Sequence, residues 1–249
     1  MPVVGMGTWR TFDTDEDRRP IVEAALGRGI DLFDTSPMYG RAEDALGRAL
    51  DGLRERVLVA DKVWTESPEE GRRQAGKALG LYGSVDVYQV HNLVSWEAQL
   101  ALLEGLREEG RVRVLGATHY QVSAFGELAK LMRTGRLGMI QIPYGPDERA
   151  AEREILPLAA ELGLGVFVMS PLQRGILERD PGPEQLAELG CGSWPEAIVR
   201  WILSDERVSC VLTATRNPDH LAQTSAGGSG DRFTPEQREE VARLSRAPG

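Results

Sequence analysis

Short apolar runs alternate with longer segments of helical spacing along the whole chain. The apolar runs are rich in β-branched residues and lie at 3–6, 30–34, 57–63, 85–90, 112–117, 139–142, 165–169 and 208–213. Between them, segments such as 15–26, 68–81, 96–109 and 123–134 place apolar residues on one face and charged residues on the other. This alternation is typical of a buried parallel sheet whose strands are joined by helices.

Eight such repeats predict an α/β protein with a closed (β/α)8 TIM barrel, formed as a single domain over residues 1–249. An open doubly wound sheet is the main alternative, because it shows the same alternation. Its glycine fingerprint is absent. Gly5-Met6-Gly7 lacks the third glycine of the G-x-G-x-x-G motif. The glycine-rich run 227–230 comes after a segment with a helical pattern instead of after a strand, so we interpret that run as a flexible surface loop.

Two other segments have distinct patterns. Residues 174–194 contain Pro181, Pro183 and several glycines and form the longest irregular connection, which predicts either a lid over the site or a solvent loop. Asn217 followed by Pro218 is a helix start, and a further helix is expected over 235–244.

Composition narrows the classes of partner and compartment. The 249 residues carry a formal net charge of −9, which disfavours binding to nucleic acid or to anionic membranes, so we expect small-molecule partners. The start of the chain has no secretory pattern, and no stretch approaches the roughly 18 apolar residues of a membrane span. The two cysteines fit neither a metal pair nor a disulfide framework, so we expect a cytoplasmic location.

Polar residues close three neighbouring apolar runs. Asp34 ends the second run, Lys62 lies near the end of the third, and His91 follows the fourth, while Tyr39 comes five residues after Asp34. In a barrel the carboxyl ends of the strands form the active face. The sequence therefore predicts that these four side chains meet at the barrel mouth.

A lysine within a buried strand is costly unless an anion lies beside it, and Asp34 on the adjacent strand is the expected partner of Lys62. These two residues alone are also compatible with a purely structural ion pair. Tyr39 favours chemistry, because an ammonium near a phenol lowers the phenol pKa toward the range useful for general acid catalysis. The three histidines lack the spacing of a metal site, so no metal is expected.

Several motifs now occur together in one order. They are Gly5-Met6-Gly7-Thr8-Trp9, the stretch from Phe33 to Gly40, Lys62-Val63-Trp64, the stretch from Val85 to His91, Gly110-Arg111-Val112-Arg113 leading to Gly116, Gln141 with Tyr144, and Ser170-Pro171-Leu172 with Gly175. With these motifs the chain resembles the aldo-keto reductase superfamily over nearly its whole length, as a short member of bacterial type.

The resemblance implies a catalytic tetrad. Tyr39 would donate a proton to the carbonyl oxygen, Lys62 would lower the tyrosine pKa, Asp34 would hold Lys62, and His91 would orient the carbonyl. A nicotinamide cofactor would supply the hydride. The substrate pocket would be formed by Tyr39 and His91 with two further aromatic residues, Trp9 and Trp64.

The resemblance also implies a cofactor site along the strand ends. Its residues would be Gly7, Thr8, Asp34, Thr118, His119, Gln141, Met169, Ser170, Leu172, Gly175, Thr215, Arg216, His220 and Gln223. NADPH is the favoured cofactor, with NADH as the alternative, because Ala214 and His220 stand where the family often has basic residues. Arg216 either compensates by binding phosphate or is a solvated surface charge.

The leading hypothesis is NADPH-dependent reduction of an aldehyde or ketone. One alternative is a cofactor-sensing regulatory barrel with little turnover, which the altered cofactor positions keep open. Another is a non-redox isomerase or lyase that uses the same tetrad. We expect a monomer or weak oligomer, and the sequence does not identify the substrate.

Overall fold

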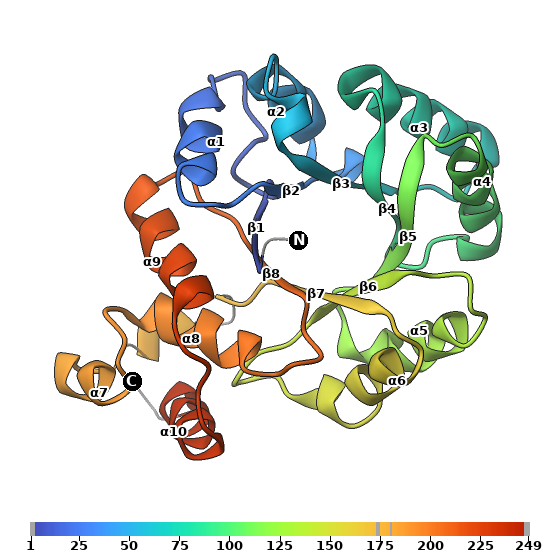
Figure 1. Cartoon of the computed structure of the whole chain (residues 1–249). Coiled ribbons are helices and arrows are strands. Elements are labelled where there is room, and N and C mark those ends of the chain that lie inside the picture. The colour runs from blue at the N-terminus through green and yellow to red at the C-terminus, as the bar shows by residue number, and fades with distance from the viewer. Residues whose placement is uncertain (1–2, 173–174, 180, 247–249) are drawn as a thin grey trace.

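Eight parallel strands close into a barrel in the computed structural model, which describes residues 3–172, 175–179 and 181–246 (Figure 1). The strands are β1 (Val4–Gly7), β2 (Leu32–Asp34), β3 (Leu58–Val63), β4 (Val85–His91), β5 (Val112–Thr118), β6 (Met139–Pro143), β7 (Gly165–Met169) and β8 (Cys210–Thr213). Each strand pairs with the next, and β1 pairs with β8 through Val4 and Val211, which closes the ring. The predicted (β/α)8 barrel in a single domain is confirmed.

Helices surround the barrel on its outside (Figure 1). They are α1 (Arg19–Leu26), α2 (Ala42–Ala49), α3 (Pro68–Tyr82), α4 (Trp96–Glu108), α5 (Phe125–Met132), α6 (Ile155–Glu161), α7 (Pro183–Glu188), α8 (Trp194–Leu203), α9 (Pro218–Ser229) and α10 (Pro235–Arg246). Three of these helices begin at a side-chain cap that accepts a backbone N–H of the first turn. The caps are Ser67 for α3, Ser193 for α8 and Asn217 for α9. No helix in the described ranges is long and apolar enough to cross a membrane.

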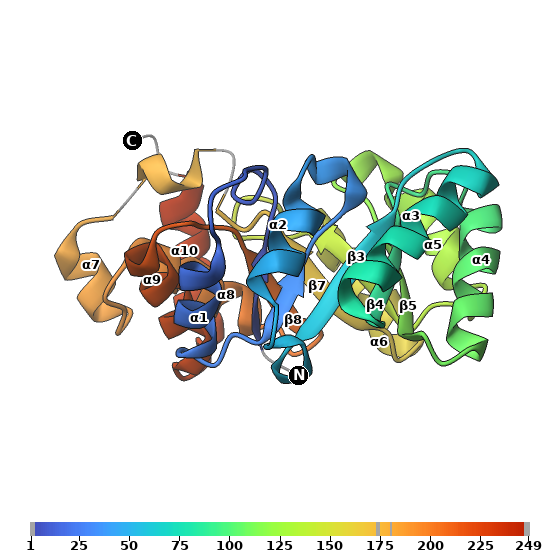
Figure 2. The same ribbon diagram turned by 90° about the horizontal axis from the view of Figure 1, so that it is seen from above.

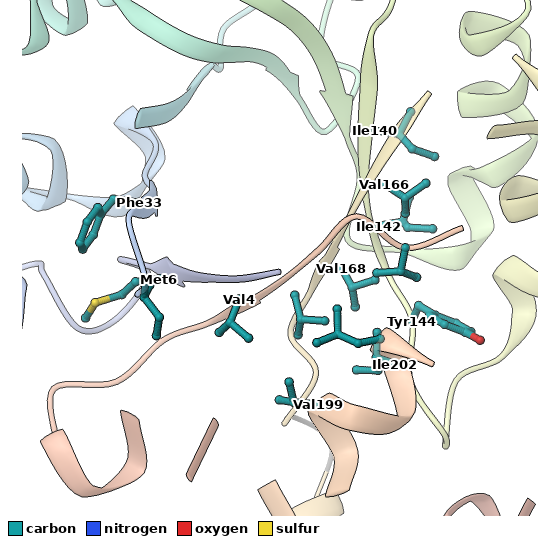
Figure 3. Packing of buried hydrophobic residues seen from close by; sticks show 14 of the residues in the cluster. Val4, Met6, Phe33, Ile140, Ile142, Tyr144, Val166, Val168, Val199 and Ile202 are labelled. Carbon is teal, nitrogen blue, oxygen red and sulfur yellow. The ribbon is translucent and has the colours of Figure 1, made fainter. Parts of the chain in front are cut away.

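The main core fills the layer between the barrel and its helices. Figure 3 shows one part of it, where Ile202 of α8 lies near Val168 of β7; Val199 of α8 and Ile142 of β6 belong to the same cluster. A second, smaller apolar layer fills the barrel interior. It consists of Leu32, Ala60, Val87, Met139, Phe167, Cys210 and Leu212. Such a layer makes the barrel a packed core rather than a pore.

The interpretation of residues 227–230 as a flexible loop is wrong. Gly227 and Gly228 belong to α9, and Gly227 is buried against α8. A Cβ atom on Gly227 would lie 2.7 Å from the Glu196 carbonyl oxygen and 2.7 Å from Val199 Cβ, closer than side chains pack. The glycine therefore permits the close approach of two helices.

Residues 174–194 are also more regular than expected. The described part contains a 3-10 turn, η5 (Ile176–Arg179), and α7, whereas Arg174 and Asp180 lie outside the described residues. Figures 1 and 2 both place α7 outside the helix ring, at the end of the molecule opposite α4. The lid remains a prediction for this segment.

Candidate active site

The side chains inside the barrel change from apolar to polar within two residues along the strands. Side chains two residues apart on a strand share a face, so Asp34, Lys62, Gln89 and Gln141 lie one step beyond Leu32, Ala60, Val87 and Met139 of the apolar interior layer. All four polar side chains are buried. The carboxyl end of the barrel therefore holds a compact layer of buried polar groups.

Lys62 is the only cation in this layer. Its ammonium donates to Asp34 Oδ1 at 2.6 Å and to the backbone oxygen of Thr35 at 2.7 Å, and its side chain is fully buried. Burial lowers the pKa of Lys62, but Asp34 and then Tyr39 act against this and leave the pKa above its ordinary value. Lys62 is therefore charged at neutral pH, as the sequence predicts.

Asp34 balances that charge from β2. Burial raises the pKa of Asp34 above its ordinary value, while Lys62 opposes the rise. Gln89 Nε2 donates to the same carboxylate oxygen over 3.4 Å. The ion pair thus has polar neighbours inside the barrel instead of water.

Tyr39 lies on a short turn above the ion pair. The turn η1 (Pro37–Tyr39) begins at Ser36, whose hydroxyl accepts the N–H of Met38 at 3.2 Å. Lys62 Nζ lies 5.3 Å from the centre of the Tyr39 ring. Burial raises the pKa of Tyr39 and Lys62 lowers it, and burial is the larger effect. The expected lowering by Lys62 is present, yet the net pKa is raised, so the phenol keeps its proton at neutral pH.

His91 ends β4 and lies beside Tyr39. The two rings meet edge to face with centres 5.7 Å apart. The Nδ1 atom of His91 lies 2.8 Å from Ser36 Oγ. Burial, followed by the charge of Lys62, holds the pKa of His91 well below its ordinary value, so the ring is neutral. The structure thus brings all four predicted tetrad residues together.

A cavity of about 310 Å³ opens beside this group. Its walls come from the ends of several strands and from the segments that follow β7 and β8. The lining residues are Gly7, Trp9, Asp34, Tyr39, Gln141, Met169, Ser170, Pro171, Leu172, Leu177, Pro195, Leu212, Thr213, Ala214, Thr215, His220, Gln223 and Thr224. Nine of the fourteen predicted cofactor residues are among them, so most of the predicted set lines one cavity.

Five predicted cofactor residues do not line the cavity. They are Thr8, Thr118, His119, Gly175 and Arg216. Two of the predicted pocket residues, Trp64 and His91, are also outside its walls, although His91 contacts Tyr39, which lines them. Trp64 is 41% exposed and lies at a separate surface depression with Glu43 and Lys77.

Two buried polar atoms have no hydrogen-bond partner among the residues that the structure describes, at the place where the carboxamide of nicotinamide is expected. They are Thr118 Oγ1 and Gln141 Oε1, on residues paired in register between β5 and β6. A carboxamide carries both N–H donors and a carbonyl acceptor, so it can satisfy the amide oxygen of Gln141 and the hydroxyl of Thr118. These residues therefore fit a nicotinamide group.

The other end of the cavity is formed by the start of α9. Asn217 caps this helix by accepting the N–H of Asp219 at 2.9 Å, and Thr215 Oγ1 accepts the N–H of Asn217 at 3.0 Å. Arg216 is exposed, and His220 lies in the first turn of the helix. The positive end of the helix dipole suits a phosphate, as expected from the sequence.

Sequence reasoning missed several residues of the site. Leu177 and Pro195 line the cavity from η5 and from α8. Gln89 bonds Asp34, and its signal was available, because it lies two residues before His91 on an inward face. Ser36 contacts His91 across 55 positions of sequence, and no local pattern reveals that contact.

No group of three or more His, Cys, Asp or Glu side chains within residues 3–172, 175–179 and 181–246 is arranged to hold a metal ion. Cys191 and Cys210 are buried free thiols.

Comparisons with known proteins point to one family. The model of the "Aldo/keto reductase family" matches residues 3–246. The "NADH-specific methylglyoxal reductase" of Escherichia coli is 30% identical over 217 residues, which are 70% of this chain and 64% of that protein. An "Aldo-keto reductase" of Mycobacterium sp. (strain KMS) is 32% identical over 235 residues, which are 89% of this chain and 81% of that protein.

Solved structures show the same fold. The crystal structure of an aldo/keto reductase from Klebsiella pneumoniae in complex with NADP and acetate matches with a TM-score of 0.82 and 20% identity. The match covers 100% of this chain and 93% of that one.

Proposed function

This chain belongs to the aldo-keto reductase family, and on that premise we propose that it reduces an aldehyde or ketone to an alcohol with NADPH as the favoured cofactor. As a member of the family it is an NAD(P)H-dependent oxidoreductase. NADH is the alternative cofactor, because one relative is named as NADH-specific and because Ala214, Thr215 and His220 line the adenosine end of the cavity, with no lysine or arginine among the described lining residues.

When bound, the reduced nicotinamide supplies a hydride to the carbonyl carbon. Thr118 and Gln141 would hold its carboxamide, and the start of α9 would face its phosphates. Tyr39 gives its phenolic proton to the carbonyl oxygen, so hydride and proton together form the alcohol. Lys62 stabilises the phenolate that remains, and Asp34 keeps Lys62 charged and in place.

The observation that carries this proposal is the position of Lys62. Its ammonium is buried, bonded to Asp34 at 2.6 Å, and lies 5.3 Å from the centre of the ring of Tyr39, which lines the cavity. A cation held there favours loss of the tyrosine proton as negative charge develops on the phenol oxygen. The neighbouring His91 supplies a neutral hydrogen-bonding group.

Cofactor binding is tested first. We would titrate the protein with NADPH and with NADH and follow tryptophan fluorescence, because Trp9 lines the cavity. Quenching by either cofactor is the expected result, whereas no binding of either would refute both the reductase and the regulatory alternative.

Turnover is tested next with a panel of carbonyl compounds that includes methylglyoxal, since two relatives are named as methylglyoxal reductases. Oxidation of NADPH should accompany reduction, and Tyr39→Phe should lower kcat by at least about 100-fold. Cofactor binding without turnover on any carbonyl would favour the regulatory barrel. Product formed without oxidation of NADPH would favour an isomerase or lyase.

We further propose that residues 1–249 act as one unit, as a monomer or weak oligomer in the cytoplasm. Free, buried cysteines such as Cys191 and Cys210 are consistent with a reducing compartment. Gel filtration would test the oligomeric state, and localisation of the tagged full chain would test the compartment.

A further inference from the structure

Ser36 connects the two groups that face the carbonyl. It is fully buried, caps the turn that carries Tyr39, and places its hydroxyl 2.8 Å from His91 Nδ1. The backbone supports the same arrangement, because the N–H of Tyr39 donates to the carbonyl oxygen of Ser36 at 3.0 Å. One small side chain therefore lies between the proton donor's turn and the imidazole.

The hydrogen-bonding capacity of the Ser36 hydroxyl decides whether Ser36 or His91 is the donor in their hydrogen bond. A hydroxyl has one proton to donate and two lone pairs that accept. The N–H of Met38 already donates to this oxygen at 3.2 Å. In the part of the chain that the structure describes, His91 Nδ1 is the one remaining partner of the hydroxyl. The O–H proton is used only if it points at Nδ1.

We propose that Ser36 is a positioning residue that donates its hydroxyl proton to Nδ1 of His91 and thereby fixes the proton of the neutral imidazole on Nε2. The opposite assignment would have Nδ1–H donate to Ser36 and would leave the buried hydroxyl proton without an acceptor, which is unfavourable. The tautomer of a histidine is set by the hydrogen bond of its other nitrogen.

The consequence for the reaction rests on the proposed carbonyl reduction. His91 Nε2 has no hydrogen-bond partner among the described residues, so an N–H at this atom is available to a ligand. A carbonyl oxygen has two lone pairs and can accept from His91 Nε2–H while Tyr39 donates to it. Because His91 stays neutral, it orients and polarises the oxygen and does not compete with Tyr39 as the acid.

The tautomer can be measured without any activity assay. The chain has three histidines, so the ring nitrogens of the protein labelled with ¹⁵N can be assigned by NMR with His91→Asn as the reference variant. We expect the wild-type spectrum of the cofactor-free protein at neutral pH to show a proton on Nε2 and none on Nδ1 of His91. A proton on Nδ1 would overturn the proposal whether or not the protein reduces carbonyls.

Two substitutions at Ser36 test the link to catalysis. Ser36→Ala should give a mixture of the two tautomers and lower kcat about tenfold, the rate equivalent of one neutral hydrogen bond, with little change in the KM for NADPH. Ser36→Thr keeps a hydroxyl and suits the extended backbone at this position, where φ is −167° and ψ is 147°, so it should restore the Nε2–H tautomer and most of kcat.

Ser204→Ala is the matched control. The Ser204 hydroxyl also accepts a backbone N–H, from Phe233 at 2.8 Å, and donates to a carbonyl oxygen, that of Arg200 at 2.7 Å. Ser204 caps the C-terminal end of α8, whereas the cavity is lined by Pro195 at the other end of this helix. Loss of the Ser204 hydroxyl should lower the melting temperature and leave kcat and the His91 tautomer unchanged. An unchanged tautomer in Ser36→Ala, or an equal loss of kcat in Ser204→Ala, would refute the positioning role.

If the wild-type protein shows the Nε2–H tautomer but no reductase activity, the hydrogen-bond assignment stands and the proposed function fails. If it reduces carbonyls and shows the Nδ1–H tautomer, the proposed function stands and the hydrogen-bond assignment fails. The two results therefore distinguish the inference from the function on which it rests.

Discussion

Replacing Lys62 by methionine removes the charge at the centre of the site while keeping a long, unbranched side chain. Asp34 then loses a charged donor at 2.6 Å and retains Gln89 at 3.4 Å, and the Thr35 carbonyl loses its donor at 2.7 Å. The charge of Lys62 is what limits the burial-driven rise of the Asp34 pKa. In Lys62→Met we therefore expect that pKa to rise further and Asp34 to take up a proton.

The effect on rate follows from distance. Lys62 Nζ lies 5.3 Å from the centre of the Tyr39 ring. At an effective dielectric constant of about 20, a full charge on the phenolate would be stabilised by about 3 kcal/mol. This corresponds to a loss of kcat of about 200-fold in Lys62→Met. Breaking a buried pair by removing one partner costs up to about 3–5 kcal/mol of unfolding free energy, less where the remaining acid is protonated.

The assay measures three quantities on each variant: kcat with NADPH and an aldehyde, cofactor Kd by tryptophan fluorescence, and unfolding free energy in urea. Lys62→Met should lose turnover and keep cofactor binding. The double variant Asp34→Asn/Lys62→Met should recover stability without recovering turnover, and Lys130→Met, on the exposed face of α5, is the control. Turnover retained in Lys62→Met would show that the lysine is only structural.

Three further predictions concern other parts of the molecule. Burial, and then the charge of Glu43, raise the pKa of Asp61 well above its ordinary value. The stability it contributes is therefore present at low pH and lost as pH rises through the folded pKa, so the urea midpoint of Asp61→Asn should increasingly exceed that of wild type as pH rises above about 4, the pKa of an unfolded aspartate. Arg216→Ala should raise the KM for NADPH about tenfold and leave that for NADH unchanged if Arg216 binds phosphate; equal changes would mark it as a surface charge. Gly227→Ala should lower unfolding free energy by about 1–3 kcal/mol, measured in urea, because its Cβ would lie 2.7 Å from the Glu196 carbonyl oxygen; an unchanged midpoint would refute the tight contact of α8 with α9.

The barrel could be predicted because its strands are buried on both faces and its helices on one, so the two periodicities alternate visibly along the chain. Neighbouring strands in sequence are neighbours in the barrel, which is why Asp34 and Lys62 could be paired from sequence alone. The position of Tyr39 could be predicted because it lies only five residues after Asp34, in the short turn that follows β2.

The remaining features depend on contacts that have no local sequence pattern. Ser36 is an ordinary turn residue until the fold brings His91 beside it. Gly227 is unremarkable in a polar, glycine-rich run until α8 packs against it. Helix α7 is short and begins at a proline in a run that also reads as a loop. In each case the deciding energy is tertiary packing, which propensity and spacing do not contain.

The layers inside the barrel indicate whether the Asp34–Lys62 ion pair serves folding or catalysis. A buried ion pair is weak evidence for stability, since replacing it by packed apolar side chains is often neutral or stabilising. One step below, the same strands meet through Leu32 and Ala60 in an apolar layer, so this barrel can be filled without charge. Asp34 and Lys62 occupy the layer that borders Tyr39 and the cavity. Their position, more than their contribution to folding, is therefore what accounts for a charged pair in this interior.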